Sequence, residues 1–77
     1  MRFRGIGPAL RRYDPVEDPD GWRELRIHIA DALRRQRGPW VIRNRIRWAR
    51  SEAQFGKAIQ DLYRWAQRHD VVIDPLD

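Results

Sequence analysis

The hydrophobic and polar positions of the chain show the clearest helical period over residues 51–69. At about 100° per residue, the apolar side chains of this segment fall on one arc and the polar ones on the other. Ser51 is a typical N-cap residue, and Gln54 completes a capping-box pattern with it. We therefore expect a helix from Ser51 to His69. Its apolar arc contains Phe55, Ala58, Ile59, Leu62, Trp65, Ala66 and His69, and its polar arc contains Lys57, Gln60, Arg64, Gln67 and Arg68.

A second helical pattern covers residues 21–37. We expect Asp20 to be its N-cap, and Gly38 followed by Pro39 to end it. Asp31 and Arg35 have the i, i+4 spacing of a stabilising ion pair. The apolar stripe that would face a core consists of Trp22, Leu25, Ile29, Ala32 and Leu33.

Residues 39–50 fit two patterns. As a strand, Trp40, Ile42, Ile46 and Trp48 alternate with arginines, whereas as a helix with Pro39 at its first position, most apolar side chains share one face. The length of the segment and its short connection to the next helix favour the helix. Only Arg50 then separates it from the Ser51 cap, as in a helix–turn–helix arrangement. Trp48 lies on the apolar face with either pattern, so we expect Trp40 to be the exposed tryptophan.

The two ends of the chain carry weaker signals. Residues 1–13 are basic, and their glycines and Pro8 argue against a helix, so we expect a flexible arm or a short edge strand over residues 2–6. Residues 14–20 form an acidic, proline-containing loop. A short β-type run at 71–73 would pair with the N-terminal strand or with residues near Trp40. We divide the chain into a basic arm plus acidic loop at 1–20 and a single helix–turn–helix-like domain at 21–77.

These elements predict a mainly α fold. It would be a three-helix helix–turn–helix or a trimmed winged helix with one or two short strands. If residues 40–48 form a strand, the alternative is a small α+β domain of order β-α-β-α-β.

The charge is almost entirely arginine. The 77 residues have a formal net charge of +5, and Lys57 is the one lysine among sixteen basic residues. Guanidinium groups pair bidentately with phosphate and with guanine, so a polyanion or an acidic protein surface is the expected partner. Cysteine is absent, and no apolar run reaches the length of a membrane span. We therefore expect a cytoplasmic protein without a membrane partner.

Catalysis has little support in the sequence. His28 and His69 lie on different expected helices and lack metal-ligand spacing, and Ser51 is explained by capping. The run from Gly5 to Gly7 is too short to form a phosphate-binding loop. We expect no enzyme activity, catalytic residue, cofactor or metal.

Nucleic-acid binding has the best support. The second helix of a helix–turn–helix enters the major groove, and basic residues of the preceding helix contact flanking phosphates. Arg2 and Arg4 would be arm contacts along the DNA. The expected DNA-binding residues are Arg43, Arg47, Arg50, Ser51, Gln54, Lys57, Gln60 and Arg64.

One stretch resembles a known family. The run from Arg47 to Ala49, followed by Ser51, Phe55 and Gly56, is similar to the winged-helix module at the end of phage and plasmid primase–helicases. The resemblance implies that Ser51 caps a recognition helix, that Phe55 enters the core and that Gly56 lets another helix pass close. It also implies that Gln54 and Lys57 face DNA and that Val71–Ile73 is the following strand. The chain departs from the family in a shorter turn and in lacking a second wing strand after Pro75.

Two functions remain open from the sequence. The first is a small protein that binds duplex DNA, as a monomer or homodimer, and acts as a regulator or accessory factor of a phage or mobile element. The second is an inhibitor or adaptor that docks its arginine-rich face on an acidic host or phage protein, with Trp40 as an anchor.

Overall fold

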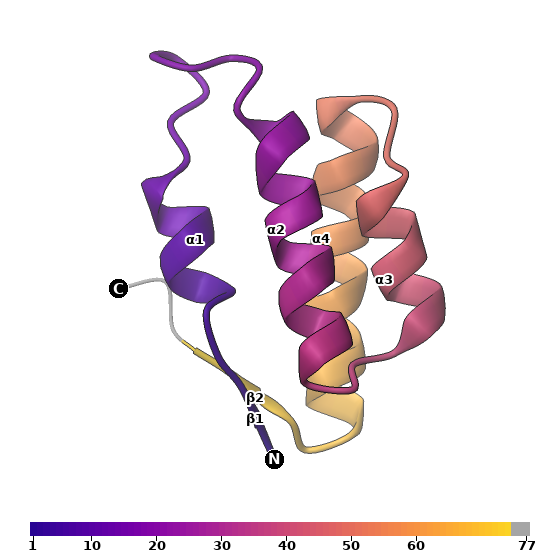
Figure 1. The fold of residues 1–77 in the computed structure, drawn as a ribbon. Helices are drawn as coiled ribbons and strands as arrows, with labels where there is room; N and C mark the ends of the chain where they lie inside the picture. Colours follow the sequence, from indigo (N-terminus) through magenta and orange to yellow (C-terminus); the bar gives the residue numbers. More distant parts are fainter. Residues whose placement is uncertain (75–77) are drawn as a thin grey trace.

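Four helices and two short strands make up residues 1–74, which are the residues that the computed structural model describes (Figure 1). The predicted mainly α fold is confirmed. Residues 40–48 do not form a strand, so the β-α-β-α-β alternative is wrong. In order, the elements are β1 (Arg2–Phe3), α1 (Gly7–Arg12), α2 (Trp22–Arg35), α3 (Trp40–Arg47), α4 (Glu52–Arg68) and β2 (Val72–Ile73).

Helix α4 begins where its sequence predicts. The Ser51 hydroxyl accepts a hydrogen bond from the backbone N–H of Gln54 at 3.1 Å. The Gln54 side chain accepts from the N–H of Arg50 at 2.9 Å, one residue before the donor of a standard capping box. His69 does not share the buried arc. It is exposed at the end of the helix and stacks on Trp65, with ring centroids 4.8 Å apart.

Glycine at position 56 has no packing role in α4. It is exposed, and a Cβ atom built there meets nothing within 4 Å. The expectation from the resemblance, that Gly56 allows another helix to pass close, is therefore wrong.

Helix α2 buries most of the predicted stripe but begins one residue later than expected. Its N-cap is Gly21, so the assignment of Asp20 as the cap is wrong. A side chain at Gly21 would place its Cβ 2.8 Å from the carboxylate of Asp18. The glycine therefore lets the acidic loop close tightly onto the helix start.

Two helix ends use left-handed residues that are not glycine. Arg37 has φ +59° and Asp70 has φ +54°. The following N–H groups close back onto the helices: Gly38 donates to Leu33 at 2.7 Å and Val71 donates to Ala66 at 2.9 Å. The left-handed residue that ends α2 is thus Arg37. Gly38 is required for a different reason, since a Cβ there would lie 2.9 Å from a methyl carbon of Leu33.

Helix α3 is short, and its tryptophans lie at its two ends. Pro39 is the N-cap with an extended backbone, and Trp48 follows the last helical residue. Ile46 and Ala49 are buried, but Trp48 is 68% exposed, so its predicted place in the core is wrong. The helix ends at Arg47, and the chain turns before Trp48 can reach the core. Trp40 is exposed, as predicted.

The N-terminal segment belongs to the folded domain. β1 pairs in parallel with β2, in the register Arg2 to Val72, and Phe3 is 0% exposed and stacks on Trp65. The predicted edge strand is therefore found over two residues, in place of the flexible arm that was its alternative. Phe3 and Ile6, on the N-terminal side of residue 20, belong to the same buried core as α2 and α4.

The helix α1 was not expected. Gly5, with φ +83°, turns the chain after β1. Pro8 then falls in the first helical turn, where its missing N–H needs no partner. The glycines and proline that argued against a helix thus define where it begins.

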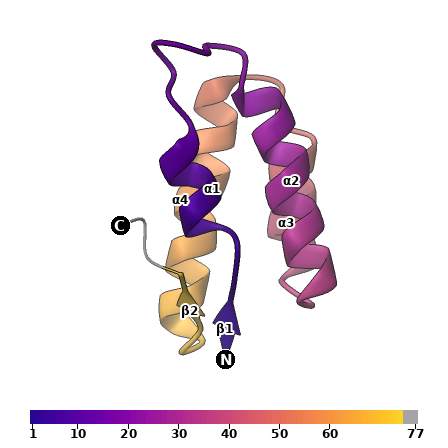
Figure 2. The ribbon, with the colours of Figure 1, turned by 60° about the vertical axis from the view of Figure 1, so that its left-hand side comes forward.

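The helices pack with α3 against both α2 and α4 (Figures 1 and 2). The two strands lie side by side at one end of the molecule, and the acidic loop between α1 and α2 lies at the other. Among residues 1–74, no helix has both the length and the apolar character to cross a membrane. The question of a second wing strand after Pro75 falls outside the described residues.

Candidate nucleic-acid interface

Helix α3 is flanked by two grooves that are rich in cations. The groove between α2 and α3 has a volume of about 430 Å³ and is lined by Arg34, Arg43 and Arg47 together with Asp31. The groove between α3 and α4 has a volume of about 450 Å³. Its polar lining consists of Arg45, Gln54, Lys57 and Asp61. Both grooves follow from the packing of one short helix between two longer ones.

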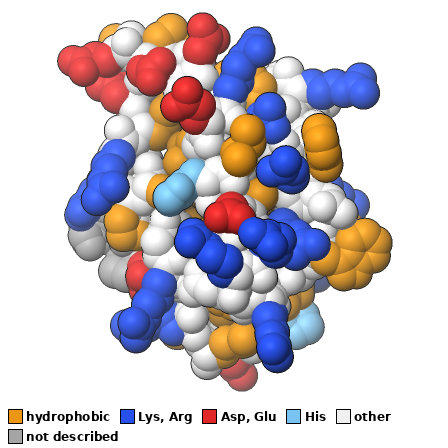
Figure 3. Space-filling view, viewed as in Figure 1, with side chains coloured by type: hydrophobic (Ala, Val, Ile, Leu, Met, Phe, Trp, Pro, Cys, Tyr) orange, Lys and Arg blue, Asp and Glu red, His pale blue; other side chains and the backbone are white. Residues whose placement is uncertain are grey.

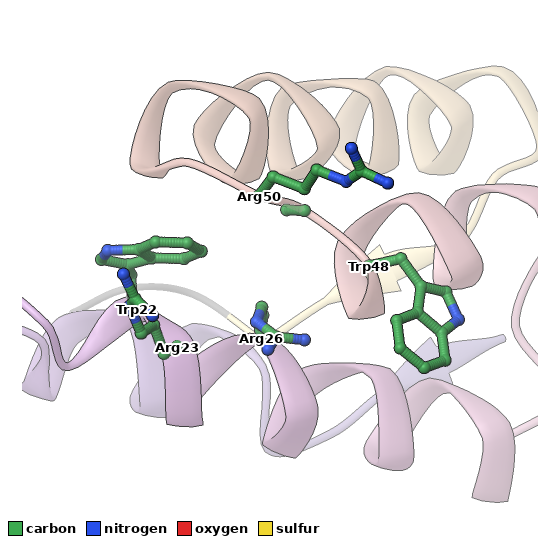
Figure 4. Close-up of a pocket in the computed structure, with 6 residues that line it drawn as sticks. Trp22, Arg23, Arg26, Trp48 and Arg50 are labelled. Carbon is green, nitrogen blue, oxygen red and sulfur yellow. The ribbon is translucent and has the colours of Figure 1, made fainter.

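A third hollow, which we call the Arg–Trp cleft, lies between α2 and the turn from α3 to α4 (Figure 4). Its volume is about 480 Å³. Figure 4 shows Arg26 between the two indoles and Arg50 extending from the opposite wall. The lining consists of Trp22, Arg23, Arg26, Trp48, Ala49 and Arg50.

Arg26 is fixed within this cleft by the backbone of α3. Its Nη1 donates a hydrogen bond to the carbonyl oxygen of Arg47. Its Nε is buried and has no hydrogen-bond partner in the part of the chain that the structure describes. Arg23 lies over the ring of the buried Trp22, at 5.4 Å from the centroid. The cleft therefore holds guanidinium groups that are partly positioned by the protein itself.

The two acids in these hollows are already paired. The Asp31 carboxylate lies 2.9 Å from Arg34 and 3.5 Å from Arg35, and Asp61 lies 3.7 Å from Arg45. The hydrogen bond from Arg34 is the main cause that lowers the pKa of Asp31, so this carboxylate stays ionised. The grooves and the cleft together have eight cations in their linings against these two acids. The cations are Arg23, Arg26, Arg34, Arg43, Arg45, Arg47, Arg50 and Lys57.

The loop between α1 and α2, which joins α2 near the Arg–Trp cleft, is acidic. In Figure 3 the acidic side chains gather over the loop between α1 and α2, and lysine and arginine side chains spread over the rest of this face. Asp14 shapes the loop by accepting a hydrogen bond from the N–H of Val16 at 2.9 Å. Asp14, Glu17, Asp18 and Glu24 line a shallow hollow there. The charges are thus segregated between this loop and the surroundings of α3.

One acid, Glu52, lies at the start of α4 near Tyr13. Burial raises the pKa of the Tyr13 hydroxyl, and the neighbouring negative charge of Glu52 raises it further. Tyr13 follows α1 and is partly buried against the core.

The eight predicted DNA-binding residues do not share one surface. Arg43 and Arg47 line the α2–α3 groove, Gln54 and Lys57 line the α3–α4 groove, and Arg50 lines the Arg–Trp cleft. Gln60 is exposed along α4, and the Ser51 hydroxyl is engaged in capping. Arg64 is exposed and lines a further hollow between α3 and α4, together with Arg45 and Asp61. Within residues 1–74, none of the ion pairs involves the cations among these eight residues.

The two predicted arm contacts are held in place. The side chain of Arg2 lies 4.0 Å from the Asp74 carboxylate. The backbone N–H and carbonyl of Arg4 are both hydrogen-bonded to the side chain of Gln36, at 2.6 and 2.8 Å. They therefore belong to a fixed strand end and cannot act as a free arm.

The sequence did not point to several residues that the structure brings into these hollows. Trp22 and Arg26 have i, i+4 spacing, which places them on one side of α2, but nothing local links them to Arg50 or Trp48. Arg45 lies on the side of α3 that meets α4, where Asp61 pairs with it. Arg26 follows Trp22 of the apolar stripe by one helical turn, and this spacing could have identified it from the sequence.

The described residues contain no group of three or more side chains able to hold a metal ion. Comparison with protein-family models, curated proteins and solved structures gave no match. The geometry and charge of the three hollows are therefore the basis for a functional proposal.

Proposed function

We propose that this protein binds nucleic acid, and DNA in particular, through the surface around α3. The observation that carries the proposal is the charge balance of the three hollows, where eight cations face two acids. Arg34 and Arg45 pair with these acids, which leaves six cations outside the ion pairs of residues 1–74. A polyanion gains from every unpaired guanidinium that it meets, because each contact releases a condensed counterion. The acidic loop joins α2 beside the Arg–Trp cleft, but within residues 1–74 none of its acids lines the cleft or the two grooves.

The arrangement of α3, turn and α4 supports a division of labour. Arg43, Arg47 and Arg50 would contact phosphates, since guanidinium forks match phosphate oxygens. Gln54 and Lys57, on the first turns of α4, would contact base edges. A regulatory or accessory role in a phage or mobile element, as the resemblance implies, is the biological setting that we propose.

Fluorescence anisotropy with labelled DNA over a series of salt concentrations tests this function. Each lost phosphate contact should reduce the slope of log affinity against log salt by about 0.9 for duplex DNA. We expect this loss for Arg47→Ala and a weaker affinity for Lys57→Ala. Arg11→Ala is the matched control, because it removes the same charge from exposed α1. Affinity that ignores salt, or equal effects of all three substitutions, would contradict the proposal.

A second candidate function is binding to an acidic protein. Trp40 is 65% exposed and the adjacent Val41 is 45% exposed, which gives α3 an apolar end suited to a protein anchor. A pull-down that recovers one stoichiometric acidic protein, lost with Trp40→Ala, would favour this function. The ratio of absorbance at 260 and 280 nm before and after a high-salt wash separates the two cases.

A further inference from the structure

We infer that the Arg–Trp cleft is a site for an unpaired segment of nucleic acid, with a base stacked on Trp48 and a phosphate held by Arg26 and Arg50. This inference deepens the proposed function and rests on it. The ligand class is single-stranded or locally unpaired nucleic acid. A site that bound phosphates alone would accept any duplex.

The first observation is the position of Trp48. Trp48 is 68% exposed, although the domain has only a small core. It lines both the Arg–Trp cleft and the α3–α4 groove. The guanidinium of Arg47 lies over the ring, 5.2 Å from its centroid, and adds positive charge there, so a base would use the other face of the indole. An exposed aromatic ring next to cations is the usual platform for stacking an unpaired base.

The second observation is the chemistry of the cleft beside that ring. Arg26 is held by the carbonyl of Arg47, and its buried Nε lacks a partner among the residues described. Arg50 faces it from the turn, and no acid among residues 1–74 lines this hollow. A phosphate entering between Arg26 and Arg50 would therefore meet two guanidinium groups without displacing an ion pair.

The combination favours an unpaired strand over other polyanions. In a duplex the base faces are stacked on one another, so the phosphates can meet the arginines but no base face can meet Trp48. An acidic protein offers carboxylates to the arginines but has no regular aromatic group beside each anion. A single strand carries one base for each phosphate, which matches an indole next to a pair of guanidinium groups.

Fluorescence anisotropy with a labelled oligothymidylate and with a duplex of the same length, at one salt concentration, tests the inference. We expect the wild-type protein to bind the single strand more tightly. Trp48→Ala should weaken single-strand binding by about tenfold, within the range measured for loss of one stacked base, and should weaken duplex binding much less. Trp48→Phe should retain most of the affinity. The matched control is Trp40→Ala, at the other end of α3 and nearly as exposed.

A second readout is tryptophan fluorescence. Stacking of a base on Trp48 should quench part of the emission on titration with oligothymidylate, and Trp48→Phe should abolish that part. Arg26→Gln and Arg50→Gln should weaken single-strand binding, whereas Arg11→Gln should not.

The outcomes separate this inference from the proposed function. If duplex is bound in a salt-dependent way, but Trp48→Ala and Trp40→Ala behave alike on the single strand, the inference is wrong and the proposed function stands. If neither nucleic acid is bound, both are wrong. An acidic protein captured through Trp48, without oligonucleotide binding, would also overturn both.

Discussion

Truncation of Phe3 would show whether the N-terminal segment is part of the fold. Its side chain is 0% exposed and stacks on Trp65 at 6.0 Å between centroids, so Phe3→Ala removes a complete buried ring. Such truncations cost about 3–5 kcal/mol of unfolding free energy. A domain of 77 residues has about 4–12 kcal/mol in total, from typical values per residue. The loss is therefore a large part of the stability.

Urea denaturation followed by circular dichroism measures this loss. With an m-value of about 1 kcal/mol/M, we expect the midpoint to fall by about 3 M, or the protein to be unfolded without denaturant. Phe3→Leu keeps most of the buried volume and should give a smaller, measurable shift. The control is Val16→Ala, because Val16 is 87% exposed in the acidic loop and its truncation should change stability by less than about 0.5 kcal/mol. If Phe3→Ala has no larger effect than Val16→Ala, residues 1–13 are not packed as the structure shows.

Three further predictions concern single positions. Gly56→Ala should stabilise the protein by about 0.5–1 kcal/mol in the same urea assay, because the site is helical and a Cβ atom there meets nothing within 4 Å. Gly38→Ala should destabilise the protein, because its Cβ would lie too close to Leu33. Equal effects of the two substitutions would contradict the packing described. Asp70→Gly should raise the urea midpoint, because it removes the cost of about 1 kcal/mol of a side chain at φ +54°, and a lowered midpoint would mean that the carboxylate has a stabilising partner. The lowered pKa of Asp31 means that its stabilising contribution is present above its ordinary pKa and is lost as the pH falls through the folded value. NMR titration of the carboxyl carbon should show this pKa rising toward normal in Arg34→Gln, and an unchanged pKa would exclude the hydrogen bond as its cause.

Most of the helical structure follows from local sequence. The Ser51 cap, the stripe of α2 and the period of α4 involve residues at most four apart, so a linear pattern contains all the information that they need. The same holds for the Asp31–Arg35 pair. Errors at the helix ends were of one to three residues: α2 begins one residue late and ends two residues early, and α3 ends three residues early. Gly21 and Arg37 adopt their conformations through contacts with the loop and with the preceding turn.

The candidate site depended on tertiary structure. The sequence determined that arginine would be abundant near residues 43–50, but it gave no means to foresee that α3 would pack between two helices and divide those arginines among three hollows. It also could not show that Trp48 follows the end of a short helix and stays outside the core. Arg26 and Arg50 are far apart along the chain. They line one cleft only because α2 and the α3–α4 turn pack together. Periodicity reports which side chains share a face of one element, whereas a site built between elements is set by how those faces pack.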